Sequence, residues 1–327
     1  MSAPAVQAHP VSRALLRDGS LALRAEARAW PAVAPWIPRI PPAEPGPGQA
    51  RAWIHAEYGP PAFVPPSTAP VIDMGGVEGW AEPSGRVLLC EREHRVSAVV
   101  DPSAGQASVR LQVPADPAEE LRIAIFAGLT LAAAFLMGRL GRTLVHAGAV
   151  VAPDGRAWLL VGGTFSGKST TCLNLMRAGW NYLADDHVVL AGAGDGVDVE
   201  GWPRKFNLDR GYAGGVSQGV RSRVDPEALV PGRWQRAAPL AGVLFPRVQA
   251  ELPTALTRVS APESLSRLLQ QSPWLLADPG TAAEVLALLQ RAARLPAFEL
   301  RLGADSYRDG EHLAKVLHLE VAATGNG

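Results

Sequence analysis

The sequence has little cysteine, little lysine and no excess of charge of either sign. Cys90 and Cys172 are its only cysteines and lack metal-ligand spacing, so neither a disulfide framework nor a cysteine-rich metal site is expected. The 31 basic and 31 acidic residues cancel, so no global electrostatic field favours nucleic acid or an anionic membrane as a partner. Lysine occurs only at Lys168, Lys205 and Lys315, whereas arginine is abundant. A lysine within a recognisable motif is therefore more informative here than in an average chain.

The sequence also lacks an apolar run long enough to span a bilayer. Its longest charge-free run, Ile123 to Gly138, has 16 residues, whereas roughly 20 are needed. Asp116 is a candidate N-cap before this run, with Pro117 at the first helical position and Glu119 at the capping-box spacing. We therefore predict a buried core helix rather than a membrane segment. The first residues, MSAPAVQAHPVSR, lack a basic segment followed by an apolar stretch, so we expect no secretion signal and a cytoplasmic location.

Proline and alternating apolar residues characterise the N-terminal third. Residues 31–70 contain twelve of the 29 prolines, which favours loop or extended coil over helix. Residues 85–114 alternate apolar and polar side chains between turn residues, a pattern typical of antiparallel strands. We predict a small, β-rich N-terminal domain over residues 1–115, in which no residue pattern indicates chemistry.

The remaining residues, 116–327, mix strand and helix patterns and predict an α/β domain. A Pro-Asp-Gly turn joins the apolar runs HAGAVV and RAWLLVGG, which predicts a hairpin. The segment WNYLADDHVVLAG predicts a strand interrupted by two acidic residues. Two amphipathic helices, a strand and a final helix are expected between residue 261 and the C-terminus.

The segment LLVGGTFSGKST, residues 159–170, matches the phosphate-loop pattern G-x-x-x-x-G-K-[ST] between a predicted strand and a predicted helix. Glycines let successive backbone N–H groups turn toward phosphate oxygens, and the following helix adds its positive end. Lys168 would reach the β- and γ-phosphates, and the Ser169 hydroxyl would bind Mg²⁺. The predicted nucleotide-binding residues are Gly162, Gly163, Thr164, Phe165, Ser166, Gly167, Lys168, Ser169 and Thr170, and the loop alone does not separate a kinase, an ATPase, a GTPase and a transporter motor.

Two adjacent acids, Asp185 and Asp186, follow the strand pattern WNYLA and should emerge at the carboxyl end of that strand, beside the loop. One carboxylate can hold Mg²⁺, and its neighbour can accept a proton from an attacking hydroxyl. Adjacent acids on an ordinary surface turn are the alternative. His146, before the hairpin, is either an active-site residue or a structural hydrogen-bonding residue, and His187 is expected to be structural or to support the site indirectly.

The order of these segments resembles the catalytic core of the HPr kinase/phosphorylase family, in particular its shorter HPr-kinase-related members. The strong match covers residues 144–190, from His-Ala through the phosphate loop and Arg-Ala-Gly to Ala-Asp-Asp, and a looser match extends to the C-terminus. The resemblance implies a fold related to phosphoenolpyruvate carboxykinase and an ATP- and Mg²⁺-dependent kinase that acts on a serine-type hydroxyl.

Several site residues are implied by this resemblance. His146, Asp185 and Asp186 occupy the positions of the active-site histidine and acids, and Asp186 is the preferred base. Glu200 and Arg204 are the nearest matches to a metal-binding glutamate and an arginine of the family, at altered spacing, so phosphorylase activity and HPr itself as substrate do not follow. A homo-oligomer is a further implication.

Residues 201–236 combine seven basic and three acidic residues with several glycines. Two interpretations stay open: a solvated loop region, or a mobile flap that supplies Arg204, Lys205 or Arg233 to phosphate charge. Three functions remain for the whole chain. They are a kinase for a small protein or peptide, including a lasso-type precursor peptide, a kinase for a small metabolite, and a non-catalytic ATP-binding regulatory or chaperone-like module.

Overall fold

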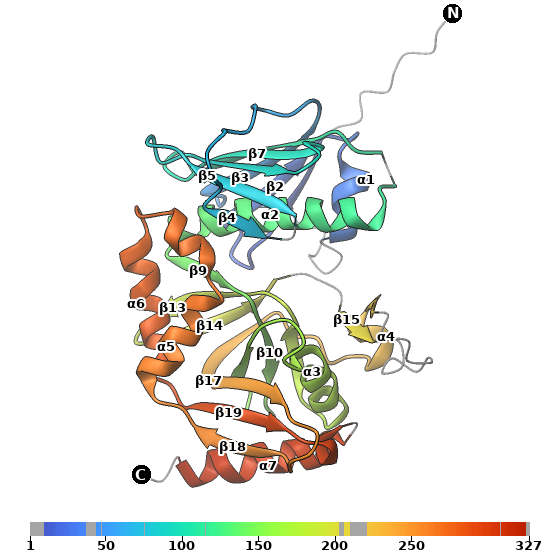
Figure 1. Cartoon of the computed structure of the whole chain (residues 1–327), viewed down its shortest axis with the longest axis vertical. Coiled ribbons are helices and arrows are strands. Elements are labelled where there is room, and N and C mark those ends of the chain that lie inside the picture. Colours follow the sequence, from blue (N-terminus) through green and yellow to red (C-terminus); the bar gives the residue numbers. More distant parts are fainter. Residues whose placement is uncertain are drawn as a thin grey trace, which may run out of the picture. The chain divides into compact units, whose positions relative to one another are not determined.

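A computed structural model describes residues 10–36, 44–46, 48–74, 76–114, 116–202, 206–209, 221–307 and 309–324. The chain forms two compact units, each with its own sheet and helices (Figure 1). The first unit comprises Met1–Gly141 and Pro273–Ala283, and the second comprises Arg142–Ser272 and Glu284–Gly327. The protein therefore has a mixed α/β fold, as predicted.

The first unit is built on an eight-stranded sheet in the order β1-β2-β3-β8-β7-β6-β5-β4. Its strands are β1 (Val11–Ala14), β2 (Leu21–Ala25), β3 (Ala52–Tyr58), β4 (Ile72–Met74), β5 (Val77–Ala81), β6 (Val87–Glu91), β7 (Val96–Asp101) and β8 (Gln106–Leu111). The predicted antiparallel arrangement of β6, β7 and β8 is confirmed. The proline-rich segment is less irregular than predicted, because β3 lies within it and a short helix, α1 (Trp30–Val33), overlaps its start.

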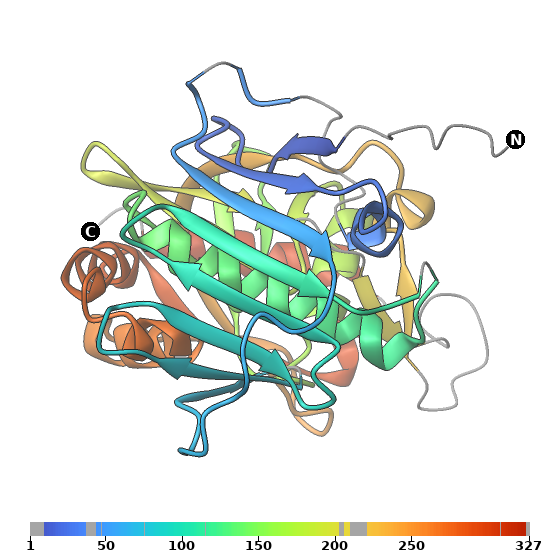
Figure 2. The ribbon, with the colours of Figure 1, turned by 90° about the horizontal axis from the view of Figure 1, so that it is seen from above.

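Helix α2 (Glu119–Gly138) packs on β6, β7 and β8 of this sheet (Figures 1 and 2). By length and composition it could cross a membrane, but 89% of its most apolar 18-residue window is buried inside the structure. Burial against the sheet therefore accounts for its apolar composition, and the core-helix prediction agrees with the packing.

Two predictions about this helix are corrected. Its N-cap is Ala118, without a side-chain cap, and Asp116 instead binds the guanidinium of Arg122. The boundary predicted at residue 115 also moves to Gly141, because α2 belongs to the first unit. Sequence periodicity showed the helix but not the sheet on which it packs.

The second unit contains a nine-stranded sheet. Its central path runs β12-β10-β11-β17-β14-β13-β9, and β19 pairs with β17 and β18. Its strands are β9 (Arg142–Val145), β10 (Ala147–Val151), β11 (Ala157–Val161), β12 (Asn181–Ala184), β13 (Val188–Ala193), β14 (Gly196–Gly201), β17 (Ala237–Val248), β18 (Ala255–Arg258) and β19 (Ala297–Leu302). The β10–β11 hairpin is confirmed. Strand β17 lies between β11 and β19 and is parallel to both.

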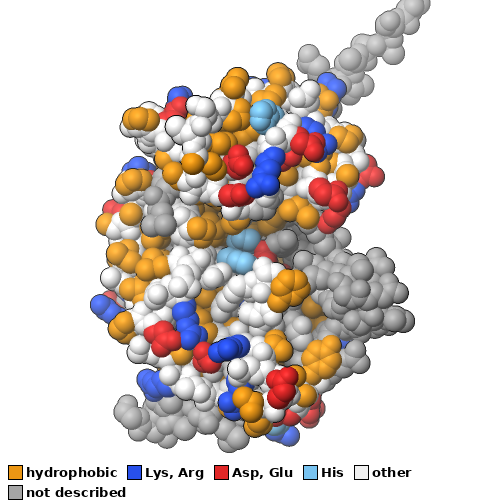
Figure 3. All heavy atoms as spheres, in the orientation of Figure 1, with side chains coloured by type: hydrophobic (Ala, Val, Ile, Leu, Met, Phe, Trp, Pro, Cys, Tyr) orange, Lys and Arg blue, Asp and Glu red, His pale blue; other side chains and the backbone are white. Residues whose placement is uncertain are grey.

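Helices and a small ribbon complete the second unit. They are α3 (Lys168–Arg177), α4 (Pro226–Leu229), α5 (Ala261–Gln270), α6 (Ala282–Ala293), nearly all of which belongs to this unit, α7 (Gly310–Thr324), and the antiparallel pair β15 (Phe206–Asp209) and β16 (Arg221–Val224). On the face that Figure 3 displays, basic and acidic side chains are interspersed, in keeping with the net charge of zero.

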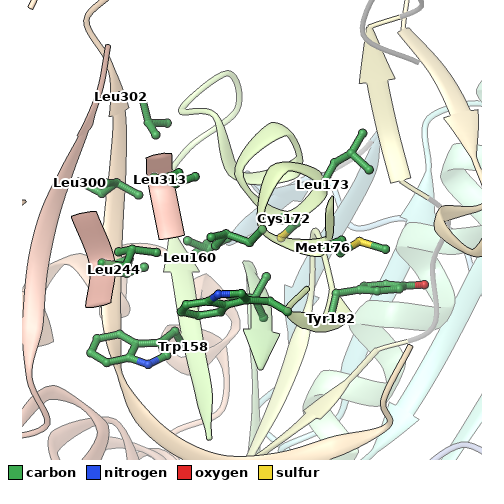
Figure 4. Packing of buried hydrophobic residues seen from close by; sticks show 14 of the residues in the cluster. Trp158, Leu160, Cys172, Leu173, Met176, Tyr182, Leu244, Leu300, Leu302 and Leu313 are labelled. Atoms are coloured by element: carbon green, nitrogen blue, oxygen red, sulfur yellow. The ribbon is translucent and has the colours of Figure 1, made fainter. Parts of the chain in front are cut away.

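The core of the second unit lies between α3 and the parallel strands (Figure 4). Cys172 and Met176 on α3 are fully buried and belong to one cluster with Leu160 on β11 and Leu244 on β17. Each large apolar side chain buried in this way contributes about 1.5–3 kcal/mol. This packing fixes the start of α3 next to the end of β11, where the glycine-rich loop lies.

Candidate functional site

The glycine-rich loop connects β11 directly to α3, so strand, loop and helix follow in the predicted order. Gly167 precedes the helix with φ +103°, and a Cβ there would lie 2.6 Å from a methyl carbon of Leu302. A Cβ on Gly162 would lie 2.8 Å from the Ser166 hydroxyl oxygen. Backbone conformation therefore favours glycine at Gly167, and the nearby Ser166 side chain leaves little space for a Cβ at Gly162.

Lys168, the first residue of α3, extends back across the loop. Its Nζ donates hydrogen bonds to the carbonyl oxygens of Gly162 (2.6 Å) and Gly163 (2.9 Å). The residue is only 7% exposed, so its charge is partly desolvated and acts strongly on nearby groups. The ammonium group thus lies at the first-glycine end of the loop.

A hydrogen bond between Ser169 and Asp185 links the start of α3 to the end of β12. The Ser169 hydroxyl donates a 2.9 Å hydrogen bond to Oδ2 of Asp185, which is 2% exposed. Burial, together with the Asp185 charge, raises the pKa of the neighbouring Cys172 thiol well above its usual value. Cys172 is therefore a protonated core residue, whereas Asp185 and Ser169 present two adjacent oxygens at the loop.

Asp186 contacts two imidazoles. Its Oδ1 lies 3.3 Å from Nε2 of His146, and its Oδ2 lies 2.7 Å from Nδ1 of His187. The two rings stack with centroids 5.3 Å apart and an interplanar angle of 23°. The Asp186 side chain is 25% exposed, so a ligand can reach this carboxylate while the histidines restrict its position.

The pKa of His187 falls from 6.5 to about 4, mainly because burial disfavours the charged imidazolium. The Lys168 charge lowers it further, while the Asp185 charge opposes the change. His187 is therefore neutral at pH 7, and its contact with Asp186 joins a neutral ring to a carboxylate. The expectation that His187 supports the site indirectly fits this placement.

Residues of the loop, of the start of α3 and of the end of β12 line one cavity of about 190 Å³, here called the phosphate-loop cavity. Its lining consists of loop and helix residues 164–170 together with His146, Asp185, Asp186, Leu208 and Val248. His146, Lys168, Ser169, Asp185 and Asp186, which are separated by up to 40 positions in the sequence, thus line a common space. Sequence reasoning did not single out Val248, although its position at the end of a buried strand pattern was a usable signal.

The residues present fit a phosphate-bound Mg²⁺. No group of three or more His, Cys, Asp or Glu side chains arranged for a metal occurs within the part of the chain that the structure describes. Magnesium in nucleotide sites keeps several waters and phosphate oxygens and needs only one or two protein oxygens. Asp185 and Ser169 supply two such oxygens at one point of the cavity.

The loop also offers a cradle for phosphate. Ser166 has a buried hydroxyl oxygen for which the described residues provide no hydrogen-bond partner. The first backbone N–H groups of α3 point back toward the loop, as at the start of any α-helix, and add the positive end of the helix dipole. These donors, with the Lys168 ammonium, suit the oxygens of a nucleoside triphosphate.

Other predicted residues lie elsewhere. Glu200 is buried on β14, with Oε1 3.0 Å from the Arg236 guanidinium and Oε2 3.7 Å from that of Arg142. Two arginines thus contact this carboxylate, and Glu200 does not line the phosphate-loop cavity, so its role as a metal ligand stays a prediction. Arg233 donates a 2.7 Å hydrogen bond to the carbonyl of Gly179, away from the loop. The predicted residues Arg204 and Lys205 lie outside the described residues.

Comparison with known proteins gives remote structural similarity alone. No known protein family matches the sequence, and no curated protein matches it. The HPr(Ser) kinase/phosphatase from Coxiella burnetii is similar in structure, with a TM-score of 0.33 and 11% sequence identity over 57% of this chain and 99% of that chain. The function of the present chain therefore has to be inferred from its own residues.

Proposed function

We propose that this chain is a Mg-ATP-dependent kinase that transfers the γ-phosphoryl group to a serine-type hydroxyl of a protein or peptide. The observation that supports it best is the meeting of a phosphate-binding loop and a reachable carboxylate in one cavity. Lys168 and the loop suit the phosphates, Asp185 and Ser169 suit the metal, and Asp186 suits a general base. The resemblance of residues 144–190 to HPr-kinase-related proteins favours a protein or peptide acceptor over a metabolite.

In this mechanism the acceptor hydroxyl lies next to Asp186. Its oxygen forms a bond to the γ-phosphorus, the bond from that phosphorus to the β,γ-bridging oxygen breaks, and ADP leaves with the electron pair. The hydroxyl proton passes to the Asp186 carboxylate, which His146 and His187 hold from two sides. A bound Mg²⁺ would neutralise phosphate charge during transfer.

Positioning and charge stabilisation account for most of the rate in such a reaction, because phosphoryl transfer requires little covalent participation of the protein. The sheet and α3 supply this rigidity, since the metal-binding and base residues follow directly from buried elements. Asp185 comes immediately after β12, and Ser169 lies in the first turn of α3.

The test compares nucleotide binding with transfer. Asp186→Asn should keep the affinity for Mg-ATP, measured by calorimetry, yet lower phosphoryl transfer by about 10²-fold or more, as expected for removal of a general base. Lys168→Ala should weaken both. Asp195→Asn, at an exposed turn between β13 and β14, is the matched control and should behave as wild type.

Transfer is followed with γ-labelled ATP and two acceptor pools, serine peptides and small hydroxyl metabolites. Labelling of the metabolite pool alone would replace the peptide acceptor by a metabolite. Binding of Mg-ATP without transfer to either pool would favour a regulatory module. If wild type shows no heat of Mg-ATP binding, the proposed function is wrong, and if Asp186→Asn transfers at the wild-type rate, Asp186 is not the base.

A further inference from the structure

Residues of the glycine-rich loop also line a second cavity, of about 330 Å³. Gly162 and Gly163 line it together with Arg247 from the end of β17 and with Arg267, Gln270 and Glu299. Ser166 lines both cavities, so the two cavities adjoin at the loop. None of the roles assigned above uses this second cavity.

Strand pairing places Arg247 at the level of the loop. Leu160 on β11 pairs with Leu244 on the parallel strand β17. Three residues beyond that pair, the two chains reach Gly163 and Arg247, which line the same cavity, and neighbouring strands are only about 4.8 Å apart. Side chains alternate along β17, so Val248 lines the phosphate-loop cavity whereas Arg247 lines the second cavity.

The Arg247 guanidinium is the cation of the second cavity that contacts no carboxylate among the described residues. Arg267 binds Glu263 (2.5 Å) and Glu299 (3.1 Å), and its guanidinium carbon lies 4.8 Å from the ring centroid of Phe245. These contacts with two carboxylates and an aromatic ring restrict the Arg267 side chain. Arg247 is exposed, and among the residues that the structure describes its guanidinium has neither an ion pair nor a hydrogen bond.

The Lys168 ammonium indicates which end of a bound nucleotide would face this cavity. In phosphate loops that ammonium serves the β- and γ-phosphates. Here it lies against the carbonyls of Gly162 and Gly163, the two glycines that line the second cavity. The γ-phosphate therefore belongs at this end, and the nucleoside extends from the opposite end of the loop.

We propose that the second cavity is an anion subsite for the transferred phosphoryl group, in which Arg247 is a catalytic residue that binds the γ-phosphoryl oxygens. The proposal rests on the proposed kinase function. As the acceptor oxygen bonds to the γ-phosphorus and ADP departs with the electron pair, the planar guanidinium donates two hydrogen bonds to the equatorial oxygens. Arg247 gives up no proton, so it stabilises charge without replacing Asp186.

The experiment needs no knowledge of the acceptor. Mg-ADP is titrated into the full-length chain by calorimetry, with and without aluminium fluoride, which together with ADP imitates the phosphoryl group in transfer. Wild type should bind Mg-ADP about 10-fold or more tightly when aluminium fluoride is present, since preorganised donors favour the transition-state charge. Arg247→Ala should bind Mg-ADP alone within about 2-fold of wild type and lose most of the tightening.

Two further variants distinguish the paired hydrogen bonds of the Arg247 guanidinium from a general effect of positive charge. Arg247→Lys should recover only part of the tightening, because an ammonium cannot make the paired hydrogen bonds of a guanidinium. Arg294→Ala, which removes an exposed arginine just after α6, is the matched control and should keep all of it.

Failure of the Arg247 subsite and failure of the kinase function give different results. Full tightening in Arg247→Ala, or an equal loss in Arg294→Ala, would overturn the role of Arg247 while leaving the kinase function intact. Absence of tightening in wild type, with Mg-ADP bound, would also overturn the subsite. Failure of wild type to bind Mg-ADP at all would remove the proposed function itself.

Discussion

His187 is buried as a neutral imidazole, so acid should destabilise the second unit of this protein in a way that one substitution can remove. The pKa of His187 is about 4 in the folded chain instead of 6.5, chiefly because of burial. Each pKa unit corresponds to about 1.4 kcal/mol. Once the pH is low enough to protonate His187 in both states, the unfolding free energy is therefore about 3 kcal/mol lower than at neutral pH. The unfolded chain binds this proton first as the pH falls, and folding stability therefore decreases between pH 6.5 and 4.

The perturbation is His187→Asn, whose amide nitrogen can take the place of Nδ1 beside Asp186 but does not titrate. From pH 7.5 to 4.5, wild type should lose about 2.5 kcal/mol more unfolding free energy than this variant. His318→Asn, at an exposed position on α7, is the matched control and should retain the wild-type pH dependence.

The assay must report the second unit alone, because two compact units can unfold separately. Met176 is fully buried in α3, and Met137 is fully buried in α2 of the first unit. Peroxide oxidation of each methionine along a urea series, followed by mass spectrometry, gives the unfolding midpoint of each unit. The pH-dependent difference between wild type and His187→Asn should appear at Met176 and be absent at Met137.

If wild type and His187→Asn lose the same unfolding free energy at Met176 between pH 7.5 and 4.5, His187 is not buried as a neutral imidazole. Such a result would mean that the imidazole is solvated in the folded chain, which contradicts its 6% exposure. An opposite sign, with wild type gaining stability in acid, would show that the carboxylates of Asp185 and Asp186 outweigh burial.

Two further predictions concern the loop and the buried ion pair. Gly167→Ala should destabilise the second unit by about 1 kcal/mol or more beyond Gly155→Ala, because both glycines have positive φ but only Gly167 faces a close neighbour, the Leu302 methyl at 2.6 Å. Equal losses of unfolding free energy in urea would contradict the steric argument. Glu200→Gln should cost about 2 kcal/mol or more by leaving Arg142 and Arg236 without their carboxylate, while Mg-ATP affinity stays unchanged. A weakened magnesium dependence with normal stability would instead support Glu200 as a metal ligand.

The sequence by itself located the groups that depend on short spacing. Four fixed positions within eight residues identified the glycine-rich loop, and a buried strand pattern placed Asp185 and Asp186 at a strand end. Such motifs can be recognised because backbone conformation and the nearest side chains are determined over a few residues. The β10–β11 hairpin was recognisable for the same reason.

Only the tertiary structure shows which strands pair and which surfaces pack, and these determine the contacts between residues far apart in sequence. The two arginines of Glu200 lie 58 and 36 positions away along the chain. Pairing of β13 with β9 and β14, and of β14 with β17, brings these segments together. Arg247 lies beside the loop only because β17 inserts next to β11 in parallel register. Helix α2 belongs to the first unit because its apolar surface packs on β6 to β8. These contacts join residues far apart in sequence, and local periodicity carries no information about which partner an apolar face or a strand edge will meet.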